Sequence, residues 1–103
     1  MSSRGIETCK EALSANKIHP YTIGEKYLIR TVTHYYTGLL TDVFEHELVL
    51  DNAAWIADTG RYTQALEQGT LEEVEPVRQK IIIGRGAIVD CAVWNHPLPD
   101  KVK

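Results

Sequence analysis

The sequence predicts one small domain of the α+β class, mainly β in content: a strongly bent five-stranded barrel with an N-terminal helix and a short helical insertion. Short runs of β-branched and aromatic residues, separated by glycines, are typical of strands in such a barrel. Two of these runs, 81–83 and 87–89, flank Arg85 and Gly86, and this spacing predicts a tight hairpin turn that carries one exposed cation. A length of 103 residues is enough for a single core.

Periodicity and turn residues divide the chain into the following expected elements: an amphipathic helix over residues 4–16, a first long strand over 26–37, a bent strand pair over 38–43 and 47–53, an insertion over 54–79, a hairpin over 80–94 and a tail over 95–103. The barrel with its insertion therefore spans residues 26–93. Inside the insertion, Asp58 to Gly60 can start a short helix, and Gly69 is a suitable left-handed stop. The acidic residues that follow are expected to be extended.

Composition is typical of a globular protein that does not insert into a membrane. Hydrophobic residues make up 44% of the chain and charged residues 24%, and no apolar run reaches the roughly 20 residues that cross a bilayer. The first residues lack the apolar core of a signal peptide, so we expect a cytoplasmic protein. Cys9 and Cys91 are then expected to be reduced, structural thiols, because their spacing matches no zinc motif.

The net charge of -3 conceals an acidic middle segment. Residues 42–75 carry one basic and nine acidic side chains, whereas residues 1–41 carry five basic and three acidic ones, and residues 76–103 five and two. An acidic surface repels a phosphate backbone, so extended contact with nucleic acid would have to use the flanking segments. A solvated acidic face is the simpler alternative.

Glycines and leucines recur in a fixed pattern at Gly38, Leu40, Leu48 and Leu50, followed by the pair Arg85 and Gly86. Over residues 26–93 this pattern resembles that of the Sm, LSm and Hfq-like small barrels. The resemblance implies a ring-shaped homo-oligomer, in which exposed edge strands of neighbouring subunits pair. In RNA-binding members, an asparagine at the bent turn and the arginine of the second motif hold a uridine; here His46 or Glu47 stands at the asparagine position. Residues 29–35 and 94–97 are also similar to small proteins of phage and bacterial genomes that have no assigned activity.

Six side chains are candidates for binding a ligand. They are Trp55, Asp58, Arg61, Tyr62, Arg85 and His46. Aromatic rings can stack, a carboxylate can accept hydrogen bonds, and guanidinium groups suit phosphate or carboxylate, so the set contains the ingredients of a nucleotide-like pocket. The alternative is structural: Trp55 packs beneath the loop, Asp58 or Thr59 caps the helix, and the two arginines are solvated.

The sequence contains no recognisable catalytic or metal-binding motif. His34, His46 and His96 lie on separate expected elements without HxxxH or HExxH spacing, and GxSxG, GxxxxGK[ST] and GxGxxG do not occur. We therefore expect no catalytic residue, no metal and no cofactor. The favoured function is a non-enzymatic homo-oligomer that binds a small nucleotide-like ligand or a protein partner. The alternatives are an RNA- or single-strand-binding ring, and a small enzyme that uses Asp58 or His96 as an acid or base.

Overall fold

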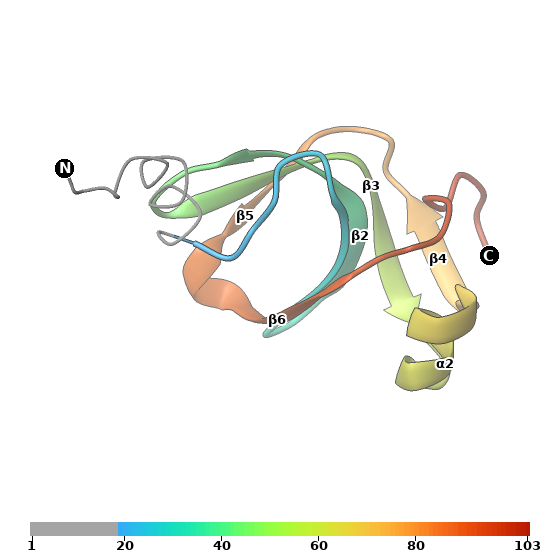
Figure 1. Cartoon of the computed structure of the whole chain (residues 1–103). Helices are drawn as coiled ribbons and strands as arrows, with labels where there is room; N and C mark the ends of the chain where they lie inside the picture. The colour runs from blue at the N-terminus through green and yellow to red at the C-terminus, as the bar shows by residue number, and fades with distance from the viewer. Residues whose placement is uncertain (1–18) are drawn as a thin grey trace, which may run out of the picture.

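The computed structural model describes residues 19–103, and the helix expected over residues 4–16 lies outside them. The elements of the described part are β1 (Lys26–Thr31), β2 (Tyr35–Val43), β3 (Glu47–Asp58), α2 (Tyr62–Gln68), β4 (Glu73–Pro76), β5 (Ile81–Gly84), the 3-10 turn η1 (Arg85–Ala87) and β6 (Ile88–Val93). The described part is thus mainly β, as the sequence predicts (Figure 1). The expected number of five strands is wrong, because the extended acidic segment joins the sheet as β4.

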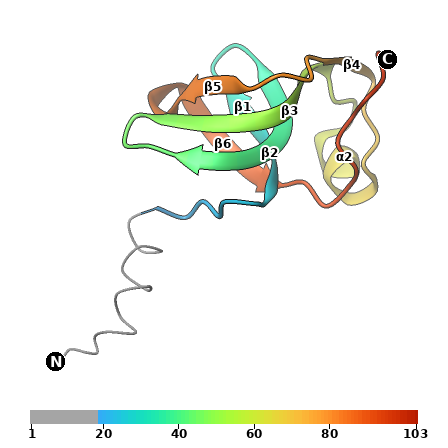
Figure 2. The same ribbon diagram turned by 90° about the horizontal axis from the view of Figure 1, so that it is seen from above.

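The strands form a six-stranded antiparallel sheet in the order β4-β3-β2-β1-β6, with β5 paired to β3 off this path. The central strand β3 pairs with β5 through residues 47–50 and with β4 through residues 54–58. The strand β3 therefore has two partners, one after the other along its length. Residues 54–58, which the sequence assigned to the insertion 54–79, are the second half of this strand. Figures 1 and 2 both show β4 and α2 at one end of the curled sheet and β5 at the other.

The strands β5 and β6 do not form the expected hairpin. The turn η1 carries the chain from β5, which pairs with β3, to β6, which pairs with β1. A hairpin turn would fold β6 back onto β5, whereas this 3-10 turn crosses from one side of the curled sheet to the other. The strand pairing is therefore an open six-stranded sheet and not the expected closed five-stranded one.

A turn divides the single long strand expected over residues 26–37 into β1 and β2. The hydroxyl of Thr31 donates to the carbonyl of His34 over 2.8 Å and accepts from the amide of His34 over 2.9 Å. The amide of Thr31 also donates to the carbonyl of His34, over 2.7 Å. The turn residues Val32 and Thr33 are themselves β-branched, so composition alone gives no sign of the turn.

The strands β2 and β3 form a bent pair, as the sequence predicts, but both are longer than the expected 38–43 and 47–53, since β2 begins at Tyr35 and β3 ends at Asp58. Their register shifts between Thr37 and Leu39, and Asn52 on the opposite strand has a φ of 52° in the left-handed region. A Cβ on Gly38 would lie 2.9 Å from the Cβ of Leu50, so only glycine permits this close approach of the two strands. The resulting bulge bends β3 between the half that pairs with β5 and the half that pairs with β4.

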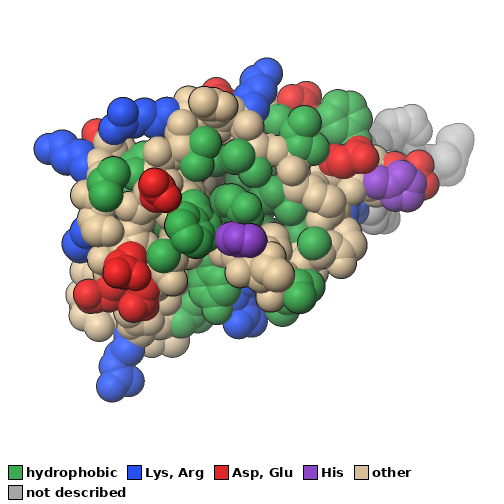
Figure 3. All heavy atoms as spheres, turned by 180° about the vertical axis from the view of Figure 1, so that it is seen from behind, with side chains coloured by type: hydrophobic (Ala, Val, Ile, Leu, Met, Phe, Trp, Pro, Cys, Tyr) green, Lys and Arg blue, Asp and Glu red, His purple; other side chains and the backbone are tan. Residues whose placement is uncertain are grey.

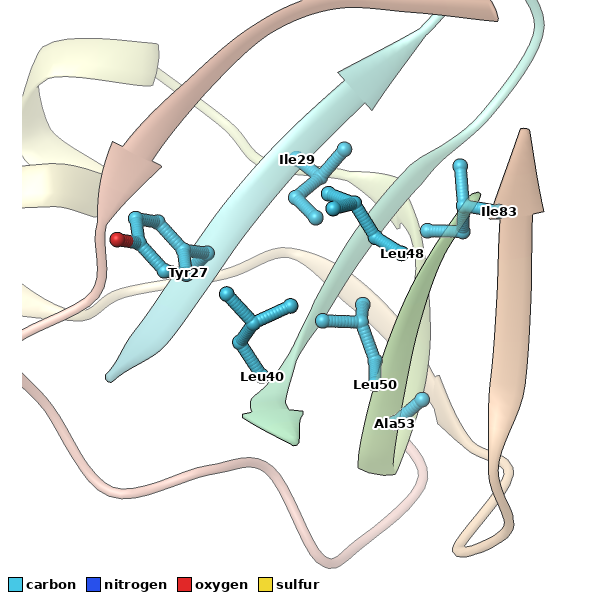
Figure 4. Close-up of a cluster of buried hydrophobic side chains, with 7 residues drawn as sticks. All are labelled: Tyr27, Ile29, Leu40, Leu48, Leu50, Ala53 and Ile83. Atoms are coloured by element: carbon cyan, nitrogen blue, oxygen red, sulfur yellow. The ribbon is translucent and has the colours of Figure 1, made fainter. Parts of the chain in front are cut away.

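Apolar clusters lie on both faces of the sheet, because successive strand side chains alternate between faces. The first cluster consists of Tyr27, Ile29, Leu40, Leu48, Leu50, Ala53 and Ile83, which point toward one another inside the curl of the sheet (Figure 4). The second cluster consists of Leu28, Ala54, Ile56, Ala65, Leu71, Val74 and Trp94. The helix α2 covers this second face with Ala65 and ends at Gly69, whose φ of 75° gives the predicted left-handed stop.

Within residues 19–103, no helix has the length and apolar character needed to cross a membrane.

Candidate binding site

Trp55 lies partly exposed where three surface grooves meet. It stands on β3 directly between Tyr36 of β2 and Glu75 of β4, so the three side chains form a row on one face of the sheet. The first groove, of about 310 Å³, is lined by Thr33, His34, Tyr35, Trp55, Ile56, Ala57, Asp58 and Thr59. The second, of about 440 Å³, is lined by His34, Tyr36, Trp55, Glu75, Pro76, Val77 and Ile81. The third, of about 380 Å³, is lined by Trp55, Ala57, Glu73, Val74, Glu75, Val102 and Lys103. We call the three grooves together the Trp55 surface.

Aromatic rings cluster at the junction of the first two grooves. The ring of His34 lies 5.8 Å from that of Trp55 and 6.0 Å from that of Tyr36, both in tilted arrangements. The Nδ1 atom of His34 is 2.7 Å from the hydroxyl of Thr33, which holds the ring at the β1–β2 turn. Figure 3 shows a face on which hydrophobic side chains surround a histidine and carboxylates lie close by. The cluster is thus an aromatic surface open to solvent.

Carboxylates accompany the aromatic rings in every groove. Asp58 lines the first groove, Glu75 the second, and Glu73 and Glu75 the third. Lys103 lines the third groove, whereas no lysine or arginine of residues 19–103 lines the first two. Among residues 19–103 none of these carboxylates has an ion pair. Within residues 19–103, the Trp55 surface therefore combines aromatic faces with three carboxylates, Asp58, Glu73 and Glu75, and a single basic side chain, Lys103.

The residues of the expected insertion do not converge on one pocket. Trp55 and Asp58 share the first groove, but Arg61 and Tyr62 line none of the three grooves. Arg61 is the exposed N-cap residue of α2, and among residues 19–103 no side-chain hydrogen bond caps that helix, so the cap by Asp58 or Thr59 that the structural alternative expected is wrong. Asp58 instead accepts a hydrogen bond of 2.8 Å from the amide of Gly60.

Tyr62 belongs to a structural cluster around Arg30. The guanidinium carbon of Arg30 lies 5.5 Å from the ring centre of Tyr62 and 6.0 Å from that of Tyr35. Two hydrogen bonds join Arg30 to Asp90, one from Nε to Oδ1 over 2.8 Å and one from Nη2 to Oδ2. The hydrogen bond from Arg30 holds the pKa of Asp90 below its usual range, and burial raises the pKa of Tyr62. The cluster fastens α2 to β1 and β6.

Arg85 is not the free cation that the sequence predicts. Its Nη1 atom donates to the carbonyl oxygens of Phe44 and Glu45 over 2.8 and 3.2 Å. Its backbone amide donates to the carbonyl oxygen of His46 over 2.8 Å. Its guanidinium carbon also lies 5.5 Å from the ring centre of Tyr21. Arg85 therefore ties η1 to the β2–β3 turn, where the exposed His46 has its Nε2 atom 3.8 Å from a carboxylate oxygen of Glu45. Neither Arg85 nor His46 lines the Trp55 surface.

The two tryptophans have different environments. Trp94 is 1% exposed and donates its indole N–H to the carbonyl of Pro97 over 3.2 Å, so it is a core residue.

The site residues that sequence reasoning missed are His34, Tyr36 and Glu75. They lie far apart in sequence and share no motif, and only the register of β2, β3 and β4 brings them to Trp55.

Neither local chemistry nor similarity assigns an activity to these residues. Burial raises the pKa of the Cys91 thiol to about 11, which is typical of an unreactive cysteine. Within the described range 19–103, no group of three histidine, cysteine, aspartate or glutamate side chains is arranged to hold a metal ion. Comparison with known proteins finds no matching family model, no matching curated protein and no matching solved structure.

Proposed function

We propose that this protein is a non-enzymatic binding protein that assembles with copies of itself and binds a small ligand or a protein partner at the Trp55 surface. The observation that carries the proposal is the position of Trp55, a large aromatic side chain left partly exposed at the meeting point of three grooves. Aromatic residues are enriched at binding surfaces, where a large apolar area becomes buried with little loss of side-chain freedom. Within the same grooves, Asp58 and Glu75 supply polar groups that can orient a ligand.

Exposed apolar side chains on two edge strands support self-association. Ile82 on β5 is 69% exposed, and Val89 and Val93 on β6 are 58% and 40% exposed. In the described part of the chain, β5 pairs only with β3 and β6 pairs only with β1, so each strand has one edge without a partner. Such edges are templates for pairing with another chain. Pairing of β5 with β6 of the next subunit is a head-to-tail contact, which closes into a ring when the rotation permits.

We infer further that this open, curled sheet is related in topology to the small barrels of the Sm-like or SH3-like kind. The curled path β3-β2-β1-β6, with β5 on the other side of β3, surrounds the first apolar cluster, and η1 bridges the open side. Gly38, Leu40, Leu48 and Leu50, on which the resemblance rests, occupy the bend and the core of this path. The binding of RNA is the less favoured alternative, because the guanidinium of Arg85 is already bonded to two backbone carbonyls.

Native mass spectrometry tests the proposal by reading subunit number and retained mass together. We expect an oligomer for the natural chain and smaller species for Ile82→Lys and Val89→Lys, because a charge on the shared edge opposes pairing. Ile23→Lys is the matched control, since Ile23 is 58% exposed but lies outside the strands. We expect any retained small mass or protein partner to be lost in Trp55→Ala.

A natural chain that is monomeric at all concentrations tested contradicts self-association. Retained RNA that is lost in Arg85→Ala, but kept in Trp55→Ala, contradicts binding at the Trp55 surface and supports the nucleic-acid alternative.

A further inference from the structure

The charge of the Trp55 surface distinguishes between classes of ligand. The aromatic rings of His34, Tyr36 and Trp55 are equally suited to a base or to a cation, but the charged groups are not. Asp58 lines the first groove and Glu75 the second, and in the part of the chain that the structure describes no lysine or arginine lines either one. A phosphate would meet uncompensated carboxylates there, whereas a cation would be attracted both by the carboxylates and by the negative faces of the rings.

The row of Tyr36, Trp55 and Glu75 across the sheet is suited to binding a cationic side chain. Trp55 lies directly between Tyr36 and Glu75 in the strand register, so an aromatic face and a carboxylate are neighbours on the same face. The ring of His34, which lines both of the first two grooves, lies 5.8 Å from that of Trp55. Tryptophan is the aromatic residue that attracts cations most strongly, and an aliphatic stem can cover its ring while the charged head reaches the carboxylate.

The third groove already holds a basic residue of this chain. Lys103 lines it together with Glu73 and Glu75, and its backbone pairs with Val74 of β4 through two hydrogen bonds of 3.0 Å. A basic segment in extended conformation can therefore lie along β4 beside Trp55. The first two grooves have the same combination of aromatic ring and carboxylate, but none of the lysines and arginines among the described residues lines them.

We propose that the Trp55 surface binds a basic peptide segment of a partner protein, with a lysine or arginine side chain lying on Trp55 between Asp58 and Glu75. A peptide is favoured over a free organic cation because two adjoining grooves, of about 310 and 440 Å³, share Trp55 and each contain a carboxylate, so they offer two acidic sites to one extended ligand. This inference rests on the proposed function, and it adds the chemical class of the ligand and the residues that select it.

The two tryptophans provide a direct measurement on the full-length chain. Each indole N–H gives its own signal in a nitrogen–proton correlation spectrum, and Trp55→Phe assigns the two signals. Titration with a short lysine-rich peptide is expected to shift the signal of Trp55 and to leave that of Trp94, which is buried and bonded to Pro97, in place. The same peptide with acetylated lysines, which lack the charge, is expected to bind at least about tenfold more weakly.

Charge variants test the carboxylates separately. We expect Glu75→Gln to weaken binding of the lysine-rich peptide by about tenfold, and Asp58→Asn to weaken it also, with the effect decreasing at high salt. Glu67→Gln is the matched control, because Glu67 is exposed on α2 and lines none of the grooves. An unchanged spectrum elsewhere shows that each variant remains folded.

Each other outcome overturns the inference in a distinguishable way. If choline shifts the Trp55 signal and the peptide does not, the ligand is a free organic cation, and the proposed binding function stands. If an oligonucleotide or an acidic peptide shifts it and the basic peptide does not, the ligand class is wrong. If Glu67→Gln weakens binding as much as Glu75→Gln, attraction to the overall acidic charge accounts for it and the assigned site is wrong. If no probe shifts the Trp55 signal, the inference fails, while the proposed function is still judged by subunit number and retained mass.

Discussion

Replacing Gly38 by alanine tests whether close approach of β2 and β3 holds the bend of the sheet. The new Cβ would lie 2.9 Å from Cβ, 3.1 Å from Cδ1 and 3.3 Å from Cγ of Leu50. Carbon atoms attract each other best at about 3.5–4.0 Å, so all three contacts are too short. Leu50 is fully buried and cannot move away without disturbing the first cluster. Such overpacking costs about 1–3 kcal/mol in the free energy of unfolding.

Gly84→Ala is the matched control for this substitution. An added Cβ on Gly84 meets no atom within 4 Å, and its φ of -67° and ψ of 126° suit alanine. Both substitutions reduce the conformational freedom of the unfolded chain equally. Where alanine can adopt the native backbone conformation, this raises the free energy of unfolding by about 0.4–1 kcal/mol. The difference between Gly38→Ala and Gly84→Ala therefore isolates the packing cost. In thermal denaturation at one fixed protein concentration, each kcal/mol corresponds to about 4–8 °C in Tm for a chain of this size.

A double-mutant cycle with Leu50→Ala gives a second, independent measurement. Removing Cγ and Cδ1 of Leu50 abolishes two of the three short contacts. Leu50→Ala should cost about 2–5 kcal/mol in the natural chain, because the side chain is buried, and measurably less in the Gly38→Ala background. The reasoning is refuted if Gly38→Ala and Gly84→Ala have free energies of unfolding within about 0.5 kcal/mol of each other, the scatter of neutral surface substitutions.

Three further predictions concern burial and charge. Trp94→Ala should lower the free energy of unfolding by about 3–5 kcal/mol and Trp55→Ala by less than half of that, because only Trp94 is buried; equal losses in urea titration would contradict this. Arg30 lowers the pKa of Asp90, so the pair stabilises the fold above the usual carboxyl pKa and ceases to do so as pH falls through the lowered value. Asp90→Asn should therefore be less stable than the natural chain at neutral pH and equal to it in strong acid, and a difference independent of pH would show that the charge is irrelevant. Cys91, with its pKa raised to about 11, should react with iodoacetamide near pH 8 at least about tenfold more slowly when folded than when unfolded, as peptide mapping would show.

Local sequence signals predict much of the fold and fail where pairing depends on distant segments. The short helix with its stop at Gly69, the β2–β3 pair and the buried leucines 48 and 50 all follow from local pattern. The β1–β2 turn is missed because Val32 and Thr33 have strand propensity, and the hydroxyl of Thr31 stabilises the turn without glycine or proline. The partners of β5 and β6 are missed because no local pattern records which strands a 3-10 turn connects.

The candidate site is predictable only in part for the same reason. Trp55 and Asp58 are recognisable from residue type alone, and they do share a groove. The hydrogen bonds of Arg85 are not predictable from the sequence, because the carbonyl oxygens that accept them belong to a turn about 40 residues earlier in the chain. Tyr36 and Glu75 reach Trp55 through strand register, which depends on tertiary packing and not on their neighbours in sequence.

The bulge opposite Gly38 connects the fold to the proposed binding surface. In a regular strand, all even-numbered side chains lie on one face. On β3, however, Leu48 and Leu50 belong to the first apolar cluster, whereas Ala54 and Ile56, beyond the bulge, belong to the second. A shift of one residue moves every later side chain to the other face of a strand. The bulge thus places Trp55 on the same face as Tyr36, where the aromatic row forms. Although Gly38 lines none of the grooves, Gly38→Ala should therefore weaken binding at the Trp55 surface as well as stability, whereas Gly84→Ala should leave binding unchanged.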